Sequence, residues 1–374
     1  MELEPTPEQQ QIRTAARRFL QAECPPALLR SLRERHAPLP RSVWSRMAEL
    51  GWLGLPFAEN HGGSAADWST IGMVMEELGR ACDPTPFADC VLGCGWLIQD
   101  LASAEQCRRW LGPLISGRVQ IALAAFEADG RWDAAACTTT LTTHSGRWWL
   151  DGCKLFVENA TSRDLLLVIA RNAESGQLQL VMVSPAARGV ECSALRSLAH
   201  PDLYELRFDA VEVAEEDLFY GSDTGAAVDA ALLRTAVFQA AAAAGGAQRV
   251  LELATEHARQ RVQFGHPIGS FQAVQHLLAN VWIDTEAARL AAYEGITELE
   301  RSPGAIAKAC AARCISNEAF TRACFAAHQV LGGMGFMWET DLHLWTRKSK
   351  EIELACGGLL YHRKLLGDAL FTTN

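Results

Sequence analysis

Hydrophobic residues recur at helical spacing from the start of the chain to about residue 115. In residues 68–81 the apolar side chains of Ile71, Val74, Met75 and Leu78 follow one another in steps of three and four. This spacing places them on one face of a helix, where they can be buried together. The first part of the chain is therefore predicted to be mainly α-helical.

The pattern changes to short β-rich runs between about residues 117 and 220. The runs are rich in β-branched and aromatic residues and are bounded by turn residues, as strands usually are. They cover residues 147–150, 164–170, 178–184 and 203–213. This middle region is therefore predicted to be a β domain.

Long helical patterns return from Gly225 onward, interrupted by Pro267, Pro303 and a glycine cluster at 332–335. The order of elements predicts three domains: an N-terminal helical domain (1–115), a middle β domain (116–222) and a C-terminal helical bundle (223–374). An alanine-rich run near Ala240 is expected to end at Gly245 and Gly246, too early for a membrane span.

Composition and charge favour a soluble globular protein. Of 374 residues, 49% are hydrophobic and 21% are charged, which excludes disorder as the main state. The formal net charge is −10 and no long basic run occurs, so a nucleic-acid partner is disfavoured. The acidic start, Met1-Glu2-Leu3-Glu4, does not resemble a signal peptide, and we predict a cytoplasmic protein.

The twelve cysteines are predicted to be reduced, as is usual in the cytoplasm. Cys90 and Cys94 are four residues apart, and so are Cys310 and Cys314. Both pairs lie in apolar segments, and neither has a second pair or a histidine at zinc spacing. We interpret them as packed thiols and predict no metal site.

Two C-terminal segments narrow the interpretation. The first runs from Arg261 through Phe264-Gly265 to Gln272, and the second from His328-Gln329 through Gly332-Gly333 to Phe336. Both resemble signatures of the acyl-CoA dehydrogenase family. Further segments resemble the family's N-terminal and middle domains; they are residues 47–81, 151–154 and 208–213.

The resemblance implies an α+β fold with an N-terminal helical domain, a β-barrel-like middle domain and a C-terminal four-helix bundle. It also implies FAD as cofactor, an acyl-CoA substrate that is desaturated at its α,β bond, an oligomer, and an electron-transferring flavoprotein as acceptor. The cofactor-binding residues that it implies are Arg261, Phe264, Gln272, Gln329, Gly332 and Gly333. An arginine offers a fixed donor fork to a diphosphate, and glycines let the backbone approach a ligand closely.

The catalytic base of the family is absent from both of its usual places. Family members carry a glutamate either late in the chain, where this sequence has Cys356, or upstream of the first signature, where it has Thr235. Glu353 is a weak substitute, about one turn before Cys356 if this segment is helical, although a solvated or paired helix charge is the simpler interpretation. Cys356 itself is interpreted as a packed thiol, since a thiol is mostly protonated at neutral pH unless a cation lies close to it.

The middle domain departs from the family pattern as well. The segment that touches the flavin in the family appears here as residues 126–133, in which Phe126 and Trp132 replace small polar residues. The segment that backs the flavin ring appears as residues 156–159, with Glu158 where the family has a hydroxyl. A carboxylate there would oppose an anionic reduced flavin.

The chain has the residues of one half of a flavin site and lacks those of the other half. In this it resembles the base-less subunit of heterotetrameric acyl-CoA dehydrogenases, which act on steroid side chains. We therefore hypothesise an α2β2 complex with a paralogous subunit that supplies the catalytic glutamate, in lipid or steroid catabolism. Two alternatives remain open: a homomeric flavoenzyme whose base is displaced or absent, and a non-catalytic structural subunit. The sequence does not identify the acyl group.

Overall fold

The computed structural model describes residues 4–199, 202–221 and 223–371. The chain forms two compact units that do not follow its linear order. The first, called the helical unit, comprises Met1–Arg35, Asp67–Pro84 and Ala236–Asn374. The second, called the mixed unit, comprises His36–Ala66 and Thr85–Thr235.

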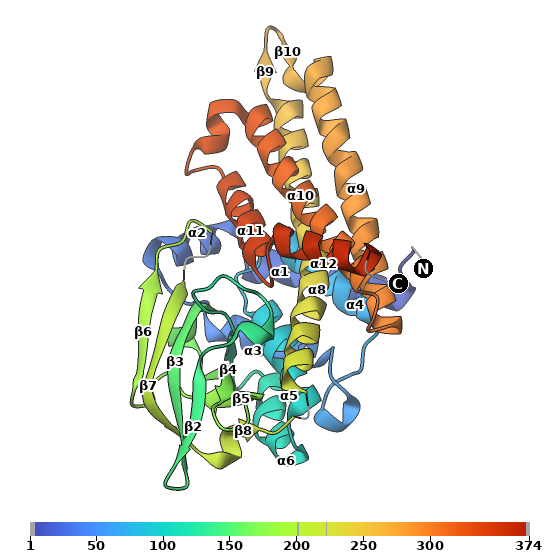
Figure 1. Cartoon of the computed structure of the whole chain (residues 1–374). Helices are drawn as coiled ribbons and strands as arrows, with labels where there is room; N and C mark the ends of the chain where they lie inside the picture. The colour runs from blue at the N-terminus through green and yellow to red at the C-terminus, as the bar shows by residue number, and fades with distance from the viewer. Residues whose placement is uncertain (1–3, 200–201, 222, 372–374) are drawn as a thin grey trace. The chain divides into compact units, whose positions relative to one another are not determined.

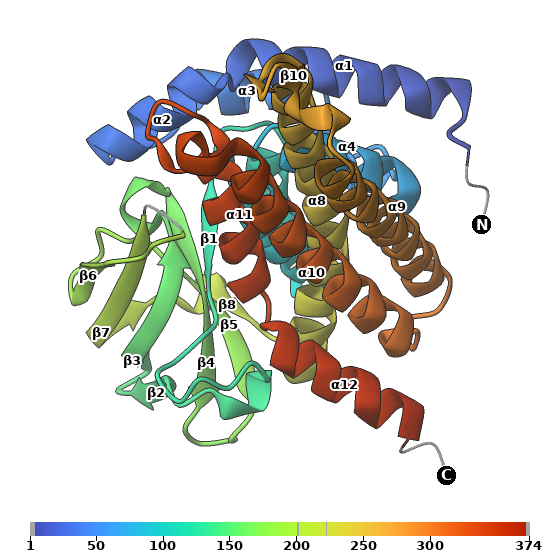
Figure 2. The same cartoon turned by 90° about the horizontal axis from the view of Figure 1, so that it is seen from above.

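The helical unit is built from long helices that pack side by side (Figure 1). They are α1 (Pro7–Glu23), α2 (Pro26–Arg35), α4 (Trp68–Arg80), the second part of α8 (Thr224–Gln260), α9 (Gln272–Arg301), α10 (Ile306–Leu331), α11 (Leu342–Leu354) and α12 (Leu359–Phe371). Helices α9 and α10 pack extensively against each other. The view in Figure 2 shows the same two helices running alongside each other.

Helix α4 confirms the predicted apolar stripe and extends it. Its four predicted apolar positions are buried, but so is every residue from Thr70 to Gly79. The buried carboxylates of Glu76 and Glu77 are satisfied by Arg13 and Arg17 of α1, with N–O distances of 2.6–3.2 Å. Ion pairing lets a helix carry charge on a face that is closed to water.

The alanine-rich run does not end at Gly245 and Gly246, contrary to the expectation, because α8 continues unbroken through both. A Cβ on Gly245 would lie 1.9 Å from the Glu76 carbonyl oxygen, and one on Gly246 would lie 2.4 Å from the Phe320 ring. The glycines therefore serve close helix packing and do not stop the helix. α8 is long and apolar enough to cross a membrane, but 67% of its apolar window is buried inside the protein, as in a core helix.

The mixed unit is organised around an eight-stranded sheet with the strand order β6-β7-β3-β2-β4-β5-β8, in which β1 pairs with β4. The strands are β1 (Ile121–Ala124), β2 (Thr140–His144), β3 (Arg147–Glu158), β4 (Leu165–Asn172), β5 (Leu178–Val183), β6 (Val190–Leu195), β7 (Leu203–Val213) and β8 (Leu218–Phe219). Most neighbours are antiparallel, whereas β1 and β2 run parallel to β4. One apolar core lies against this sheet, formed mainly by leucine, valine and alanine side chains.

Short helices complete the mixed unit. They are α3 (Arg41–Glu49), α5 (Trp96–Leu101), α6 (Ala104–Gln106) and α7 (Gly112–Ile115), with π-helical segments at Phe87–Gly95 and Cys107–Leu111. The first part of α8 also belongs to this unit. The predicted order of helices, strands and helices is confirmed.

The four predicted strand regions are all strands, and four further strands of the described part of the mixed unit were missed. β1 and β8 are short apolar runs without alternation, which periodicity alone does not distinguish from helix. β2 and β6 are polar and half-exposed, so they lack a strong hydrophobic pattern. The β3 prediction was too short, because a bulge between Leu150 and Gly152 breaks the pattern while the strand continues.

The predicted packed thiols lie in the cores of their units. Cys90, Cys94 and Cys310 have no exposed surface and Cys314 is 8% exposed. Among the described residues no cysteine forms a disulfide, and no three His, Cys, Asp or Glu side chains gather as a metal site.

Candidate functional site

The first segment implied in cofactor binding is a tight hairpin beyond the end of α8. Strands β9 (Val262–Gln263) and β10 (His266–Pro267) pair antiparallel, leaving Phe264 and Gly265 as a two-residue turn. Both turn residues have positive φ, 54° and 81°, as a type I′ turn requires. The Phe264 side chain is 90% exposed, and its ring edge meets Phe271 at a centroid distance of 6.2 Å.

The second segment is the end of α10. Gln329 is exposed on the last turn, and Gly332 ends the helix with a φ of 60°. A Cβ placed on Gly332 or Gly333 would meet no atom within 4 Å, so both backbones face open space. The turn is fixed by His328, whose ring stacks on Phe336 at 4.6 Å and whose Nε2 lies 2.8 Å from Thr346 Oγ1.

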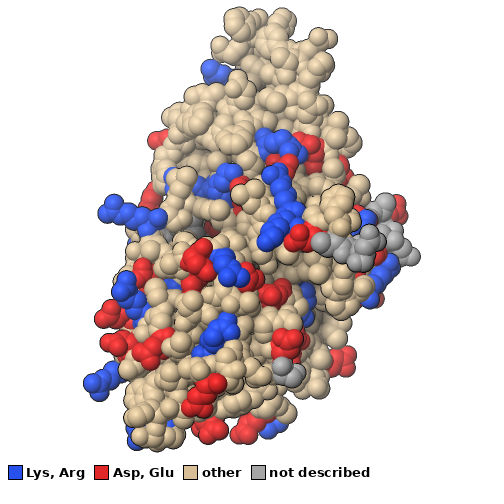
Figure 3. All heavy atoms as spheres, in the orientation of Figure 1, with Lys and Arg blue, Asp and Glu red and all other residues tan. Residues whose placement is uncertain are grey.

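Both segments lie at the same end of the helical unit, because α8 ends, α9 begins and α10 ends there (Figure 1). All six implied cofactor residues have exposed backbones or side chains. Large apolar side chains are also exposed at this end: Val262, Phe264, Phe271, Met334, Phe336 and Met337. Few charged residues appear on this end of the unit at the top of Figure 3. This end, called the bundle end, therefore offers an open surface of apolar side chains and accessible backbone.

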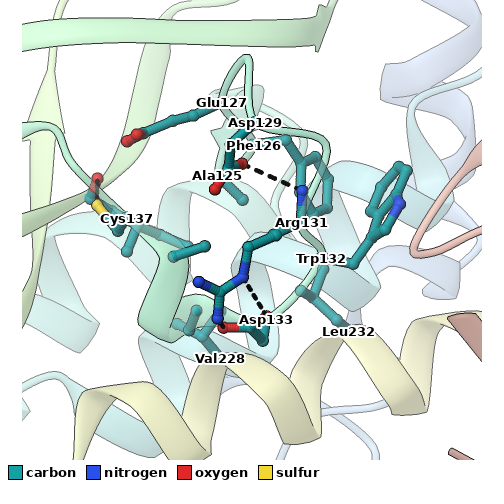
Figure 4. A pocket seen from close by; sticks show the side chains of 13 residues that line it. Ala125, Phe126, Glu127, Asp129, Arg131, Trp132, Asp133, Cys137, Val228 and Leu232 are labelled. Atoms are coloured by element: carbon teal, nitrogen blue, oxygen red, sulfur yellow. Dashed lines mark hydrogen bonds and ion pairs between the residues drawn. The ribbon is translucent and has the colours of Figure 1, made fainter.

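The flavin-facing segment of the middle domain is occupied by its own aromatic side chains. Phe126 and Trp132 meet edge to face with ring centroids 4.3 Å apart. They line a small surface hollow of about 280 Å³, part of it open to solvent, together with residues of α8 such as Val228 and Leu232 (Figure 4). Both aromatic residues are half-buried, so they pack only in part into the core of the mixed unit.

A buried ion pair lies beside that hollow, and sequence reasoning missed it. Lys154 on β3 has no exposed side-chain surface, and its Nζ donates to Glu127 Oε1 at 2.7 Å. Glu127 also accepts from the backbone and hydroxyl groups of Thr138 and Thr139, and these donors together with Lys154 lower its pKa to about 2 although burial opposes them. Lys154 also donates to Cys137 Sγ at 3.3 Å.

The second flavin-facing segment ends β3. Phe156 and Asn159 have positive φ, 60° and 53°, and Phe156 is half-exposed. Glu158 is half-buried and lies close enough to Asp89 to act on it electrostatically. Burial, and then Glu158, raise the pKa of Asp89 to about 8, while Arg163 opposes the change. This segment therefore places the Glu158 carboxyl group where the resemblance to the family implies a hydroxyl.

The two usual positions of the catalytic base lie in different units. Thr235 is buried in the mixed unit, and its hydroxyl donates to the Ala231 carbonyl one turn earlier at 2.9 Å. Cys356 lies in the helical unit, between α11 and α12, with a φ of 51°. It is half-buried, so its thiol is packed only in part. The left-handed turn at Cys356 holds its side chain partly at the surface.

Glu353 is a paired helix charge, as predicted. Its Oε2 accepts from Lys350 Nζ at 2.6 Å and lies 3.4 Å from Thr321 Oγ1. The helix ends at Leu354, and Ala355 is extended, so Glu353 and Cys356 do not share a helical face. The expectation of one regular turn between these two residues is therefore not met.

The residues implied for FAD fit the cofactor unevenly. The bundle end offers an arginine, open glycine backbone and exposed apolar side chains, which suit a nucleotide that carries a diphosphate. The mixed unit offers the Phe126–Trp132 pair and the acidic Glu158 in the segments where the family has small polar groups. The chain therefore carries residues for one side of a flavin site more clearly than for the other.

Known protein domains match nearly the whole chain. Residues 6–118 match the acyl-CoA dehydrogenase N-terminal domain, residues 122–211 the middle domain and residues 225–371 the C-terminal domain. The chain is 27% identical over 368 residues to the probable acyl-CoA dehydrogenase YngJ of Bacillus subtilis, covering 96% of each protein. It is 29% identical over 346 residues to the glutaryl-CoA dehydrogenase of Desulfococcus multivorans, covering 89% of this chain and 88% of that protein.

Solved structures agree with this result. A variant of the Tcur3481–Tcur3483 steroid ACAD superimposes with a TM-score of 0.86 and 26% identity, covering 97% of both chains. The predicted fold class, with helical, β and helical domains, is thereby confirmed. The chain belongs to the acyl-CoA dehydrogenase family, whose members are FAD-dependent oxidoreductases that act on CH–CH groups.

Proposed function

We propose that this chain is one subunit of a heteromeric acyl-CoA dehydrogenase that desaturates an acyl-CoA thioester between its α and β carbons. In the proposed α2β2 complex, the bundle end completes the FAD site of a paralogous subunit. The partner supplies the catalytic glutamate and the flavin-facing middle domain. The observation that carries this proposal is the contrast between the open bundle end and the self-filled Phe126–Trp132 segment.

The missing base supports the same proposal. FAD, when bound, would supply the hydride acceptor for the β carbon, and a base would be needed for the α proton. The Thr235 hydroxyl donates a hydrogen bond to a backbone carbonyl, and the side chain is buried away from solvent. Glu353 is held by Lys350. A partner that carries a glutamate would remove the need for either residue.

In the bundle end, we propose that Arg261, Phe264 and Gln272 hold the diphosphate and adenosine side of FAD. Gln329, Gly332 and Gly333 would bring backbone and amide groups against the same cofactor. The exposed Phe264 and Phe336 would then be covered by the partner subunit. Exposed apolar surface of this kind is typical of subunit interfaces.

The substrate class is proposed from the similarity to the Tcur3481–Tcur3483 steroid ACAD. We propose a bulky, steroid-type acyl-CoA, a role in lipid or steroid catabolism, and a cytoplasmic location with an electron-transferring flavoprotein as acceptor. We also propose that residues 1–115, 116–222 and 223–374 form the three domains.

The test is the visible absorption spectrum of the chain purified alone and after co-expression with a paralogue that carries a glutamate at one of the two base positions. We expect a colourless chain alone and a yellow complex with one flavin per mixed pair. A yellow homomer with one flavin per chain would overturn the proposal.

A matched pair of variants tests the role of the bundle end in the mixed complex. Arg261→Ala should lower the flavin affinity about tenfold or more, because a charge-assisted hydrogen bond contributes about 1.5–3 kcal/mol. Arg301→Ala is the control, since Arg301 ends α9 and pairs only at the surface with Glu298. Equal flavin retention in both variants would contradict the proposed role of Arg261.

A further inference from the structure

Lys154 and Cys137 bring two nucleophilic atoms into contact in the interior of the mixed unit. The Lys154 Nζ lies 3.3 Å from Cys137 Sγ, and the Lys154 side chain has no exposed surface. Each atom has a further partner: Nζ donates to Glu127 Oε1 at 2.7 Å, and Sγ donates to the Ile169 carbonyl at 3.3 Å. The fold therefore holds the amine and the thiol next to each other.

The pair lies beside the surface hollow that the mixed unit forms with the first part of α8. Glu127 and Cys137 are among the residues that line this hollow, and Cys137 is 6% exposed (Figure 4). Part of the hollow is open to solvent, so it offers a path to the sulfur for an oxidant as small as hydrogen peroxide. Cys137 is therefore a nearly buried thiol that a small oxidant reaches from one side.

We propose that Cys137 and Lys154 form a redox modification site, in which hydrogen peroxide converts their contact into a covalent sulfur–nitrogen bond (a sulfenamide). The Cys137 sulfur first attacks one peroxide oxygen. A sulfur–oxygen bond forms, the oxygen–oxygen bond breaks, and the leaving hydroxide takes the thiol proton and departs as water. The thiol is thereby oxidised to a sulfenic acid and the peroxide is reduced. The reaction needs neither flavin nor a partner subunit, so it goes beyond the proposed subunit role.

The second step joins the two side chains. The Lys154 Nζ gives one proton to Glu127 Oε1, which it already contacts at 2.7 Å, and the neutral amine attacks the sulfur. A nitrogen–sulfur bond forms, the sulfur–oxygen bond breaks, and the leaving hydroxide takes a second amine proton and departs as water. A sulfenic acid condenses with a nitrogen in this way. The product leaves the Lys154 nitrogen and the Glu127 carboxyl group both neutral, so no buried charge loses its partner.

Proximity decides which reaction follows the first oxidation. An amine held 3.3 Å from the sulfur is at the separation of a near-attack arrangement, which makes the step effectively unimolecular. Further oxidation to a sulfinic acid needs a second peroxide molecule, and thiols do not reverse it. Two thiol molecules, in contrast, restore Cys137 and Lys154 from the sulfenamide and are themselves oxidised to a disulfide. The cross-link is therefore expected to protect Cys137 from irreversible oxidation.

The first oxidation is expected to be slow, and the test allows for this. Burial raises the pKa of Cys137, Lys154 opposes the change only in part, and the thiolate is the form that attacks an oxidant. The full-length protein would be treated with excess hydrogen peroxide at mildly alkaline pH and digested with trypsin. Trypsin places Cys137 in residues 132–147 and normally cleaves after Lys154. A sulfenamide blocks that cleavage, so the linked product joins residues 132–147 to residues 148–163.

Mass spectrometry should find these two fragments joined and lighter by two hydrogen atoms, and dithiothreitol should separate them. A disulfide from Cys153, the neighbour of Lys154, would join fragments of the same region, so the measurement is made in the Cys153→Ser variant. Lys154→Arg in that background is the matched control, because arginine keeps a cation for Glu127 but has no nucleophilic amine. It should lose the cross-link and accumulate the sulfinic acid at Cys137.

Unlinked Cys137 in the peroxide-treated Cys153→Ser protein, either reduced or oxidised to the sulfinic acid, would overturn the proposal, whether or not Lys154→Arg folds. A cross-link that appears only together with oxidation of Cys90 and Cys94 would also overturn it. Those two thiols have no exposed surface, so their oxidation would show that the reaction follows unfolding. Flavin content plays no part in these outcomes, so their failure is separate from a failure of the proposed function.

Discussion

Each of the two units buries a cation next to a cysteine, but only one of the two cations has a carboxylate partner. In the mixed unit, Lys154 lies 2.7 Å from Glu127 and 3.3 Å from Cys137. In the helical unit, Arg313 donates to two carbonyls at the end of α11, one of which is that of Ala355, next to Cys356. Because Glu127 already compensates the positive charge of Lys154, no charge is left for Cys137 to compensate. Burial raises the pKa of the Cys137 thiol.

The difference between the two buried cations indicates a different role for each. A fully paired cation, whose partner accepts several further hydrogen bonds, holds loop and strand together and contributes to stability. A cation that lacks a carboxylate is available to stabilise a nearby anion that forms later. The Lys154–Glu127 pair rigidifies the segment at 126–139. The Arg313 guanidinium instead lies beside the turn at Cys356 without a carboxylate partner.

The largest expected effect comes from breaking the paired cation. Glu127→Gln should lower the free energy of unfolding by about 3–5 kcal/mol, because it leaves Lys154 buried without a negative partner. Urea denaturation followed by circular dichroism would measure the change. Glu212→Gln is the control, since Glu212 pairs with Arg147 at the surface, where both side chains are more than half exposed.

The control should change stability by no more than about 0.5 kcal/mol. If Glu127→Gln had as little effect as Glu212→Gln, the carboxylate would not be the group that compensates Lys154. The contrast between the two buried cations would then be lost.

An intermediate effect is expected from pH. His362 has a pKa of about 4 in the folded protein, below the ordinary value of 6.5, because burial and Arg313 disfavour its charged form. A basic group with a lowered folded pKa favours folding fully above pH 6.5, and this contribution is lost as the pH falls towards 4. Between pH 7 and pH 5 the loss should be about 2 kcal/mol in the free energy of unfolding.

His362→Gln should remove this part of the pH dependence, since a glutamine amide can still donate to the Cys356 carbonyl. Denaturant titrations of both proteins at pH 7 and pH 5 would give the difference between the two slopes. Identical slopes would mean that His362 is not held neutral beside Arg313.

The smallest effect is expected from removing the cation that lacks a carboxylate. Arg313→Met should lower the free energy of unfolding by only about 1 kcal/mol, because the lost hydrogen bonds are offset by the charge that no longer has to be buried. Thermal and urea denaturation would measure it against Glu127→Gln. A loss as large as that of Glu127→Gln would show that Arg313 is compensated as fully as Lys154.

The family's fold was predictable because its signals are local or patterned. The helical spacing in α4, the strand runs in the middle region and the spacing of the two C-terminal signatures lie within short stretches of sequence. A hydrophobic period follows directly from the geometry of a helix or strand, so these elements could be identified without contacts. The continuation of α8 through Gly245 and Gly246 was not predictable, because it depends on packing against Glu76 and Phe320.

The sequence by itself determined the residue types at the cofactor and base positions, including Cys356, Thr235 and Glu158. It did not determine their electrostatic surroundings. Arg313 lies 43 residues before Cys356 in the sequence, and Lys154 lies 27 residues after Glu127. Whether a cation is paired depends on distance and burial in space, and only the tertiary structure brings such distant groups together and removes the water between them.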